Sequence, residues 1–354
     1  MPLGLKQKVR VLIADDSLVA REMLATILGT DPDIEVVGQA KDGAEAVDMV
    51  ERLRPDLVTM DIHMPKLDGL GATEKIMAYT PTPILVVSSS VYGEGIGRAF
   101  DALDLGALEV IKKPEPKDWA ELDRIGREVI RRVKVLANVR VITHIKGRRT
   151  HERGGIAGPL VGAGVSSRSL VAIGSSTGGP SALLSVLGRL PADLPVPIVV
   201  AQHIADGFIP GLVSWLDAGC KLSVVAAEEG QRIEPGVVYF APTGQNMVLD
   251  GGQLRFEKPG PGQLYIPSAD TLFTSVARSH GKRAVGVILT GMGADGADGL
   301  KLLRNTGAET IAQDEASCTV FGMPKAAIEI GAASQVLPLL AIAEAIEALV
   351  AAKA

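Results

Sequence analysis

Short apolar runs rich in β-branched residues alternate with segments of helical period, and this alternation restricts the possible folds more than any other feature of the chain. Across residues 8–135 it predicts five strands and five helices, starting with the strand VRVLIA at residues 9–14. The strands are almost continuously apolar, so helices are expected to bury both of their faces. This part of the chain is therefore predicted to be an α/β domain with a doubly wound parallel sheet.

A second series of strands and helices begins at Ser169 and defines a second predicted α/β domain, residues 169–354. Its strands include SLVAIG, PIVVAQ and AVGVILTG, and the turn Asp250-Gly251-Gly252 predicts a β-hairpin inserted among them. A length of 354 residues suits two domains, and a hydrophobic content of 47% supplies two cores. The apolar segment 337–352 is interrupted by two glutamates, so we expect an amphipathic helix there rather than a membrane span.

Residues 136–168 separate the two series and have the composition of a linker. They contain many glycines and a clear excess of Arg and Lys over acidic residues. A solvated tether is the favoured interpretation, although the basic bias leaves a contact with an anionic partner open.

Charge and cysteine content exclude several classes of protein. Thirty-six Lys and Arg against 41 Asp and Glu give a net charge of −5, which lacks the positive field that nucleic-acid binding needs. Cys220 and Cys318 are far apart and have no histidine cluster nearby, so neither a disulfide framework nor a zinc site is expected. The first apolar stretch is too short for a secretion signal. A cytoplasmic protein without membrane insertion is therefore predicted.

Polar residues follow four of the five strands predicted in the first half. They are Asp15 and Asp16 after the first strand, Asp61 after the third, Ser88 after the fourth and Lys113 after the fifth. The carboxyl ends of parallel strands meet at one edge of the sheet, where three carboxylates repel one another unless a divalent cation such as Mg²⁺ lies among them. Each aspartate alone is better explained as a cap. Together they predict a phosphoryl-transfer site in which Asp61 becomes an aspartyl phosphate beside Lys113.

This half of the chain resembles the receiver domains of bacterial two-component response regulators. The resemblance covers roughly residues 8–135 and is carried by Asp15-Asp16-Ser17, Asp61-x-x-Met64-Pro65-x-x-Asp68-Gly69, the strand 83–88 and Lys113-Pro114. It implies a flavodoxin-like fold, phosphorylation of Asp61 by a chemotaxis-type histidine kinase, and Mg²⁺ held by Asp15, Asp16 and Asp61. It also implies signalling through Ser88 and Lys113. Val110 stands where many receivers have an aromatic switch residue, so the aromatic part of the usual output stays open.

A second group of polar residues follows strands of the second half. Gly174-Ser175-Ser176-Thr177-Gly178 matches the pattern of a nucleophile elbow between a strand and a helix, although such a turn is as often an anion cradle or a capped helix start. His203 follows PIVVAQ, and Asp295 lies in the loop after AVGVILT, so both reach the edge of the sheet that carries Ser176. A serine nucleophile needs a base and an orienting carboxylate, and Ser176, His203 and Asp295 are predicted to fill these roles.

Rival residues for these roles are less favourably placed. His63 lies in the acid pocket, His144 and His151 lie in the linker, and His280 ends a predicted helix, where it caps carbonyls. Asp298 is the rival to Asp295, but its position is typical of the start of the following helix. The order Ser, His, Asp also differs from that of the α/β-hydrolases.

Residues 169 to about 350 resemble the catalytic domain of the chemotaxis protein-glutamate methylesterases. The motifs are Ile173 to Gly179, Ala201-Gln202-His203, Tyr239 to Pro242, Pro267 to Asp270, Leu289 to Gly296 and Phe321 to Pro324. The resemblance implies a Rossmann-like domain in which Ser176 is the nucleophile, His203 the general base and Asp295 its orienting carboxylate. The Met292 amide and the region of Thr177 are the expected oxyanion donors.

The same resemblance implies an activity and its regulation. The expected substrates are glutamate γ-methyl esters, and particular glutamines, on methyl-accepting chemoreceptors, with no cofactor at the hydrolase site and with the unphosphorylated receiver covering the cleft. Two alternatives stay open: a non-enzymatic phospho-switch that binds receptor helices, and a methylesterase of a chemosensory array unrelated to motility. A DNA-binding regulator is disfavoured because the second half lacks a basic helix-turn-helix.

Overall fold

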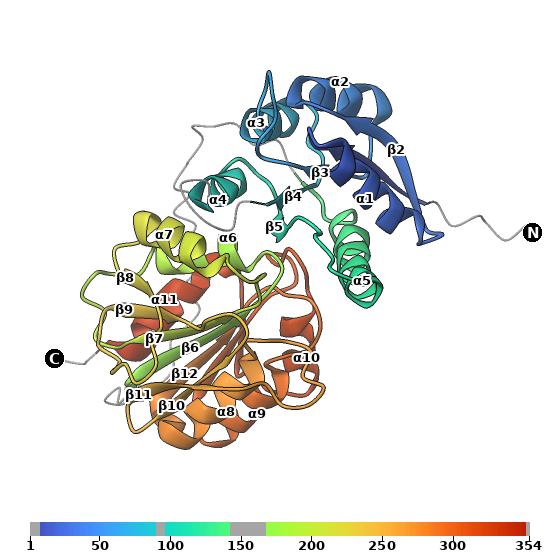
Figure 1. Cartoon of the computed structure of the whole chain (residues 1–354). Helices are drawn as coiled ribbons and strands as arrows, with labels where there is room; N and C mark the ends of the chain where they lie inside the picture. The colour runs from blue at the N-terminus through green and yellow to red at the C-terminus, as the bar shows by residue number, and fades with distance from the viewer. Residues whose placement is uncertain (1–7, 90–95, 142–167, 352–354) are drawn as a thin grey trace, which may run out of the picture.

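The computed structural model describes residues 8–89, 96–141 and 168–351, which form two α/β domains (Figure 1). The first domain has a five-stranded sheet in the order β2-β1-β3-β4-β5, and all of its neighbouring strands are parallel. Its strands are β1 (Val9–Ala14), β2 (Ile34–Ala40), β3 (Leu57–Met60), β4 (Ile84–Ser88) and β5 (Glu109–Lys112). The prediction of a doubly wound parallel sheet is confirmed.

Five helices cover the two faces of this sheet: α1 (Leu18–Gly29), α2 (Gly43–Leu53), α3 (Gly69–Tyr79), α4 (Ile96–Asp104) and α5 (Trp119–Leu136). Successive side chains of β1 point to opposite faces, as the strand geometry requires. Val11 and Ile13 pack in a core with α1 and α5, while Leu12 and Ala14 belong to the core that includes α2, α3 and α4. Helix α5 ends at the first residue of the predicted linker, most of which lies outside the described residues.

The second domain has a seven-stranded parallel sheet in the order β14-β13-β12-β6-β7-β9-β8. The strands are β6 (Leu170–Ser175), β7 (Ile198–Gln202), β8 (Ser223–Ala226), β9 (Val237–Phe240), β12 (Ala284–Ile288), β13 (Glu309–Gln313) and β14 (Gln335–Leu337). The predicted hairpin is confirmed as β10 (Asn246–Asp250) paired antiparallel with β11 (Gln253–Glu257). Gly251 and Gly252 join these strands with φ of 55° and 81°, the left-handed conformation that favours glycine in a tight hairpin turn.

The helices of the second domain are α6 (Gly179–Leu187), α7 (Ile209–Gly219), α8 (Ala269–Ser279), α9 (Ala297–Asn305), α10 (Met323–Glu329) and α11 (Leu339–Val350), with a short 3₁₀ turn, η1, at Gly281–Arg283. Helices α6, α7 and α11 contribute to one core, and α8, α9 and α10 to the core on the other face. Helix α11 confirms the predicted amphipathic helix, whereas α10 and β14 were not predicted. Within the described parts of the chain, no helix is both long and apolar enough to cross a membrane.

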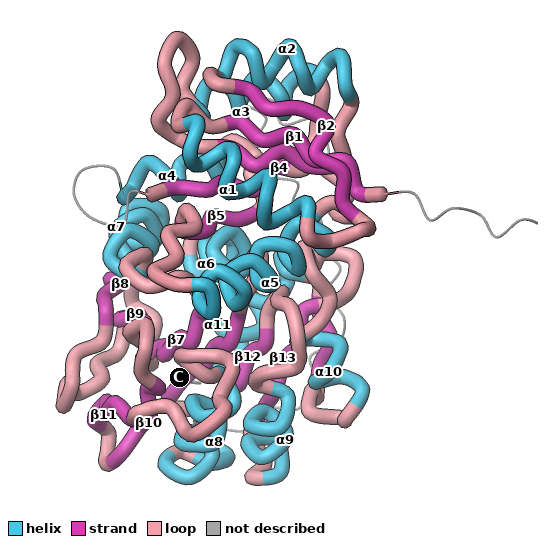
Figure 2. Tube along the Cα trace, turned by 45° about the vertical axis from the view of Figure 1, so that its right-hand side comes forward, coloured by secondary structure: helices cyan, strands magenta, loops and turns pink. Residues whose placement is uncertain are grey.

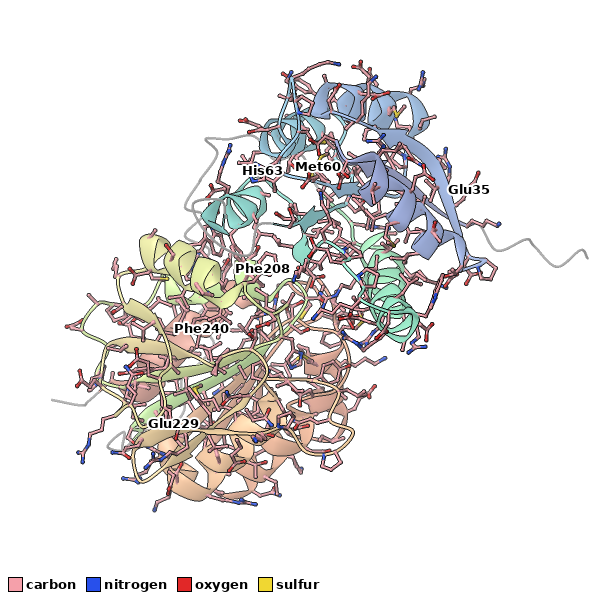
Figure 3. The ribbon with its side chains drawn as sticks, viewed as in Figure 1. Glu35, Met60, His63, Phe208, Glu229 and Phe240 are labelled. Atoms are coloured by element: carbon pink, nitrogen blue, oxygen red, sulfur yellow. The ribbon has the colours of Figure 1, made fainter. Side chains whose placement is uncertain are left out.

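The two domains touch through α4 of the first and α7 of the second, which lie side by side in Figures 1 and 2. The Phe100 ring meets Phe208 edge-on at a centroid distance of 6.1 Å, and it stacks on Trp215 at 5.9 Å. Phe208 is labelled in Figure 3 at this contact. The Trp215 indole N–H donates to Asp104 Oδ2 at 3.2 Å. An aromatic cluster with one polar anchor therefore joins the domains.

Candidate functional site

Three aspartates gather at the carboxyl edge of the first sheet. Asp15 and Asp16 follow β1, Asp61 follows β3, and one carboxylate oxygen of each lies within 4.8 Å of the others. Asp15 and Asp61 are buried, whereas Asp16 is exposed. The structure thus brings together the three residues predicted as metal ligands. Hard oxygen donors with one side open to solvent fit Mg²⁺, which usually keeps several water ligands.

Lys113, which follows β5, supplies a positive charge to this pocket. Its Nζ lies 2.7 Å from Asp15 Oδ2 and 3.1 Å from Asp61 Oδ2. Burial alone would lower the pKa of Lys113, but the two carboxylates outweigh burial and raise it. Burial raises the pKa of Asp61, with a further contribution from the charge of Asp15 and opposition from Lys113. Because one ammonium does not balance three carboxylates, the set of donors suits an added divalent cation.

The backbone after β3 fixes the position of Asp61. Its Oδ1 accepts a hydrogen bond from the Ile62 N–H at 2.9 Å, and the Gly69 N–H donates to the Ile62 carbonyl at 2.9 Å. A Cβ on Gly69 would lie 1.9 Å from the Asp61 carbonyl oxygen, so no larger residue fits this turn. Ser88 is buried at the end of β4, and the buried residue at the aromatic switch position of β5 is Val110.

In the second domain, Ser176 lies in a tight turn between β6 and α6. Its N–H donates to the Thr290 carbonyl at 3.0 Å, and its own carbonyl accepts from the Gly179 N–H at 2.8 Å. Gly178, the N-cap residue just before α6, has φ of 75°, and a Cβ on Gly179 would lie 2.0 Å from Gln202 Oε1. Two glycines are therefore required for the sharp strand-to-helix turn that carries the serine.

His203 and Asp295 meet at the same edge of the sheet. His203 follows β7 and Asp295 follows β12, and these strands flank β6. The distance from His203 Nε2 to Asp295 Oδ2 is 2.7 Å, and both residues are buried. The His203 N–H donates to the Ser175 carbonyl at 3.0 Å, which ties the histidine to the strand of Ser176. The structure thus places the three predicted triad residues at the ends of neighbouring strands.

Donors from the start of α8 hold the Asp295 carboxylate. Oδ1 accepts from Ser268 Oγ at 2.8 Å and from the Asp270 N–H at 3.2 Å, and Oδ2 accepts from the Ala269 N–H at 2.7 Å. Burial alone would raise the pKa of Asp295, but the hydrogen bond to His203 and these donors hold it below its ordinary value. A carboxylate at a helix N-terminus is also favoured by the helix dipole. Ser268 was not predicted to belong to the site.

The other imidazole nitrogen, Nδ1 of His203, is buried and has no hydrogen-bond partner among the described residues. Since Nε2 is engaged by Asp295, Nδ1 is the nitrogen that remains available to accept a proton. In the described part of the chain, no hydrogen bond joins Ser176 Oγ to this nitrogen. Such contacts are often long until substrate binds.

The predicted oxyanion donors lie in two loops that meet at Ser176. Thr177 follows Ser176 directly, and a Cβ on Gly291 would lie 2.8 Å from Ser176 Cβ, so the backbone leading to Met292 passes close to Ser176. Neither the Thr177 N–H nor the Met292 N–H donates to an acceptor within the described ranges. Both amides therefore have an unused backbone donor in the loops beside Ser176, which is what the prediction of oxyanion donors requires.

Gln202 joins the backbones of the serine and the histidine. Its Nε2 donates to the Ser176 carbonyl at 2.9 Å and to the His203 carbonyl at 2.8 Å, while its Oε1 accepts from Ser175 Oγ at 2.6 Å. A fully bonded buried amide of this kind fixes the relative position of the two strand ends. Its role as a brace was not predicted, and the only sequence signal is a polar residue at the end of an apolar strand.

The first domain places a carboxylate against this edge. Glu109 of β5 is buried, and its Oε1 accepts a hydrogen bond from Thr177 Oγ1 at 3.3 Å. The same oxygen pairs with Arg132 of α5. Burial lowers the pKa of Arg132 to about 10, which leaves the guanidinium charged at neutral pH. The first domain therefore covers the residue next to Ser176.

The rival residues lie elsewhere. His280 directly follows α8, with its ring beside the Ser279 hydroxyl, and burial lowers the pKa of His280. His63 is exposed in the first domain, and Asp298 occupies the first turn of α9. His144 and His151 lie outside the described residues.

Two family models match the chain, one in each half. A model described as a response regulator receiver domain matches residues 11–122, and a model described as CheB methylesterase matches residues 171–346.

Proteins of similar length also match. The chain is 46% identical over 346 residues to protein-glutamate methylesterase/protein-glutamine glutaminase 2 of Anaeromyxobacter dehalogenans, covering 98% of each chain. It is 44% identical over 344 residues to enzyme 3 of the same name from Myxococcus xanthus, covering 97% of this chain and 94% of that one. Among solved structures, it is similar to the Thermotoga maritima CheB methylesterase catalytic domain, with 39% identity, a TM-score of 0.49, and coverage of 52% of this chain and 99% of that one.

Proposed function

The chain belongs to the CheB methylesterase family, and from this membership we propose how its two sites carry out and control the reaction. It is a protein-glutamate methylesterase and protein-glutamine glutaminase linked to a receiver domain. We propose Ser176 as the nucleophile, His203 as the general base and Asp295 as the carboxylate that orients the imidazole. The buried pair of His203 and Asp295, 2.7 Å apart beside the end of β6, carries this assignment.

In the first half of the proposed reaction, Ser176 Oγ attacks the γ-carbonyl carbon of a glutamyl methyl ester while His203 takes the hydroxyl proton. The carbonyl oxygen becomes an oxyanion that accepts hydrogen bonds from the Thr177 and Met292 amides. The bond to the methoxy group then breaks, and the imidazolium returns its proton to release methanol. The negative charge of Asp295 stabilises the imidazolium throughout.

In the second half, water attacks the acyl group on Ser176 and gives its proton to His203. Collapse of the second tetrahedral intermediate breaks the bond to Oγ, which regains the proton, and a glutamate side chain is released. A glutamine substrate follows the same path with ammonia as the first leaving group. One set of residues thus serves both the esterase and the glutaminase activity.

We propose Asp61 as the phosphorylation site of the receiver. Its carboxylate oxygen would take a phosphoryl group from a phosphohistidine of the partner kinase, with Lys113 neutralising charge on the phosphoryl oxygens and Ser88 turning its hydroxyl toward them. Asp15, Asp16 and Asp61 would hold Mg²⁺, which supplies further neutralisation of the transferred group. The excess of carboxylates over ammonium groups in this pocket supports the assignment.

Regulation follows from the position of the receiver. The contact from Glu109 to Thr177 and the aromatic cluster between α4 and α7 support a closed state in which the receiver limits access to Ser176. Phosphorylation activates the enzyme only if it disfavours this closed state relative to an open one. The proposed partners are a chemotaxis histidine kinase and the helices of methyl-accepting chemoreceptors, in the cytoplasm.

The test is methanol release from methylated receptor by the full chain and by its Ser176→Ala variant, each with and without acetyl phosphate and Mg²⁺. We expect release by the wild type to rise with the phosphodonor and release by Ser176→Ala to fall to background. An Asp61→Asn variant should keep basal release and lose the rise.

Other outcomes would overturn the assignment. Equal release by wild type and Ser176→Ala would defeat the serine mechanism. Receptor binding without any release of methanol would instead support a non-enzymatic phospho-switch. Parallel assays with receptors of motility and non-motility arrays would identify the pathway that the enzyme serves.

A further inference from the structure

The face of the His203 imidazole is covered by a second aromatic ring. The ring of Tyr265 stacks on the imidazole with a centroid distance of 4.8 Å and an interplanar angle of 9°. Tyr265 belongs to neither predicted constellation, and the assigned mechanism does not use it. A nearly parallel, close stack on a general base restricts the orientations that the imidazole can adopt.

The loop that carries Tyr265 is fixed on both sides of the ring. Before it, Gln263 exchanges hydrogen bonds with Asn246, whose Nδ2 donates to Gln263 Oε1 at 2.9 Å. After it, the Ser268 N–H donates to Asn246 Oδ1 at 2.9 Å. Asn246 is itself buried on β10. One buried side chain therefore anchors both ends of the segment, and the stacked ring is built into the fold.

In the closed arrangement, the hydroxyl of Tyr265 also meets the first domain. Arg131 of α5 donates to the tyrosine hydroxyl at 3.2 Å, and a Cβ on Gly293 would lie 2.4 Å from that hydroxyl. Gly293 has φ of 89°, so glycine both permits this backbone and leaves room for the phenol. The neighbouring Leu264, in contrast, is 87% exposed.

The imidazole needs such support because its other restraints are few. Nε2 is bonded to Asp295, but Nδ1 has no partner among the described residues. A single hydrogen bond fixes one point on the edge of the ring, so it does not by itself set the plane of the imidazole. A change in this plane would change the direction in which Nδ1 points, and proton transfer depends strongly on alignment.

We propose that Tyr265 is a positioning residue that holds the plane of His203 so that Nδ1 meets the Ser176 hydroxyl. Its ring packs against the imidazole face while Asp295 holds the imidazole edge. The segment from Tyr265 to Ala269 thus supports both partners of the pair, because Ser268 and Ala269 bind the carboxylate. This inference rests on the proposed roles of Ser176 and His203.

The test compares Tyr265→Leu and Tyr265→Met, which lose the flat ring, with Tyr265→Phe, which keeps it. Leu264→Ala is the matched control on the same loop, and Ser176→Ala is the inactive reference. All variants are full chains activated with acetyl phosphate and Mg²⁺. Two readouts are needed: kcat and KM on methylated receptor, and the rate at which a small fluorophosphonate labels Ser176. Thermal unfolding reports whether each variant is folded.

For both aliphatic variants we expect kcat to fall roughly 10- to 100-fold with KM almost unchanged. Fluorophosphonate labelling should slow in parallel, because the small probe needs the activated serine but makes no contact with a receptor-binding surface. Tyr265→Phe and Leu264→Ala should retain wild-type rates.

Three results would overturn the proposal. A rise in KM with unchanged labelling would make Tyr265 a receptor contact, and faster labelling would make it a cover over the serine. Wild-type kinetics in both aliphatic variants would remove any role for the ring. The Ser176→Ala variant separates a failure of this proposal from a failure of the proposed function. If that variant is inactive, the serine mechanism stands even where the role of Tyr265 does not.

Discussion

At the scale of single residues, Asp295 is a buried carboxylate of the serine site that accepts several hydrogen bonds. Its carboxylate accepts from an imidazole, a hydroxyl and two backbone amides while buried. Asp298, three residues further on, is exposed in the first turn of α9. These two aspartates form a matched pair for mutation because they are close in the sequence but differ in burial and in hydrogen bonding.

We expect Asp295→Asn to lower kcat by about three to four orders of magnitude, because a neutral amide no longer stabilises the imidazolium or selects its tautomer. Asp298→Asn should change kcat less than about threefold, since surface changes away from such features have small effects. Methanol release by the two variants under activating conditions measures both. A comparable loss in the Asp298 variant would move the carboxylate role to that residue.

Because of Asp270, the free energy of unfolding is expected to depend on pH. Burial raises the pKa of Asp270 to about 6, assisted by the charges of Asp295 and Asp298 and opposed by a hydrogen bond from the Gly299 N–H. A raised pKa means that the folded state binds this proton more tightly than the unfolded state does. Protonated Asp270 therefore contributes its full stabilisation of the folded state below about pH 3.8, and this contribution is lost as pH rises through about 6.

Asp270→Asn should remove this dependence while keeping an oxygen for the Gly299 N–H. We therefore expect the difference in unfolding free energy, variant minus wild type, to increase from pH 4.5 to pH 7. The increase should be on the order of 1–2 kcal/mol, after allowance for solvent screening of a partly exposed group. Urea unfolding at the two pH values measures the difference. Parallel pH profiles for the two proteins would contradict the assignment.

Among the secondary-structure elements, β5 and α5 carry the receiver's polar contacts to the catalytic edge. Glu109 on β5 binds Thr177, and Arg132 on α5 pairs with both Glu109 and Glu128. Glu128 is largely exposed and is not bonded to the second domain in the described structure. The two glutamates thus share a guanidinium but differ in whether they reach the serine site.

Glu109→Ala should raise basal methanol release without a phosphodonor. Loss of a contact worth about 1–2 kcal/mol shifts a closed-to-open equilibrium roughly 5- to 30-fold, which sets the largest expected gain. Glu128→Ala should leave basal release unchanged. Equal activation by the two substitutions would show that the effect arises from Arg132 and not from the contact with Thr177.

The elements also show how far the sequence could be used for prediction. The strands and their parallel order follow from apolar runs and helical spacing, and so do the residues at strand ends, including Ser176, His203 and Asp295. Strand β14 has three residues and α10 has seven. These lengths are too short for the two-residue alternation of a strand or the 3.6-residue period of a helix to be recognised. Gln202, Tyr265 and Glu109 were missed as site residues because their contacts depend on tertiary packing, which no local pattern reports.

Across the whole molecule, the contact between α4 and α7 contains a spectroscopic reporter. The chain has two tryptophans: Trp215, 9% exposed in the aromatic cluster, and Trp119, 85% exposed at the start of α5. Replacing Trp119 with Phe leaves Trp215 as the single indole, hydrogen-bonded to Asp104 across the domain contact.

In the Trp119→Phe background, acetyl phosphate and Mg²⁺ should shift Trp215 emission to longer wavelength as the indole becomes hydrated. Adding Asp61→Asn should abolish the shift. Fluorescence and methanol release recorded on the same samples test the link between them. A rise in activity with unchanged emission would mean that activation leaves the contact between α4 and α7 intact.

Because Glu109 and Thr177 belong to one polypeptide, the proposed closed state would make the receiver a tethered inhibitor, present at one copy per serine site. Its occupancy is an intramolecular equilibrium, so neither dilution nor overexpression changes the inhibited fraction. A cell that makes more of this enzyme also makes the same additional amount of its inhibitor. On this proposal, total activity scales with copy number, while the fraction released from inhibition is set by the closed-to-open equilibrium and by the phosphorylation level.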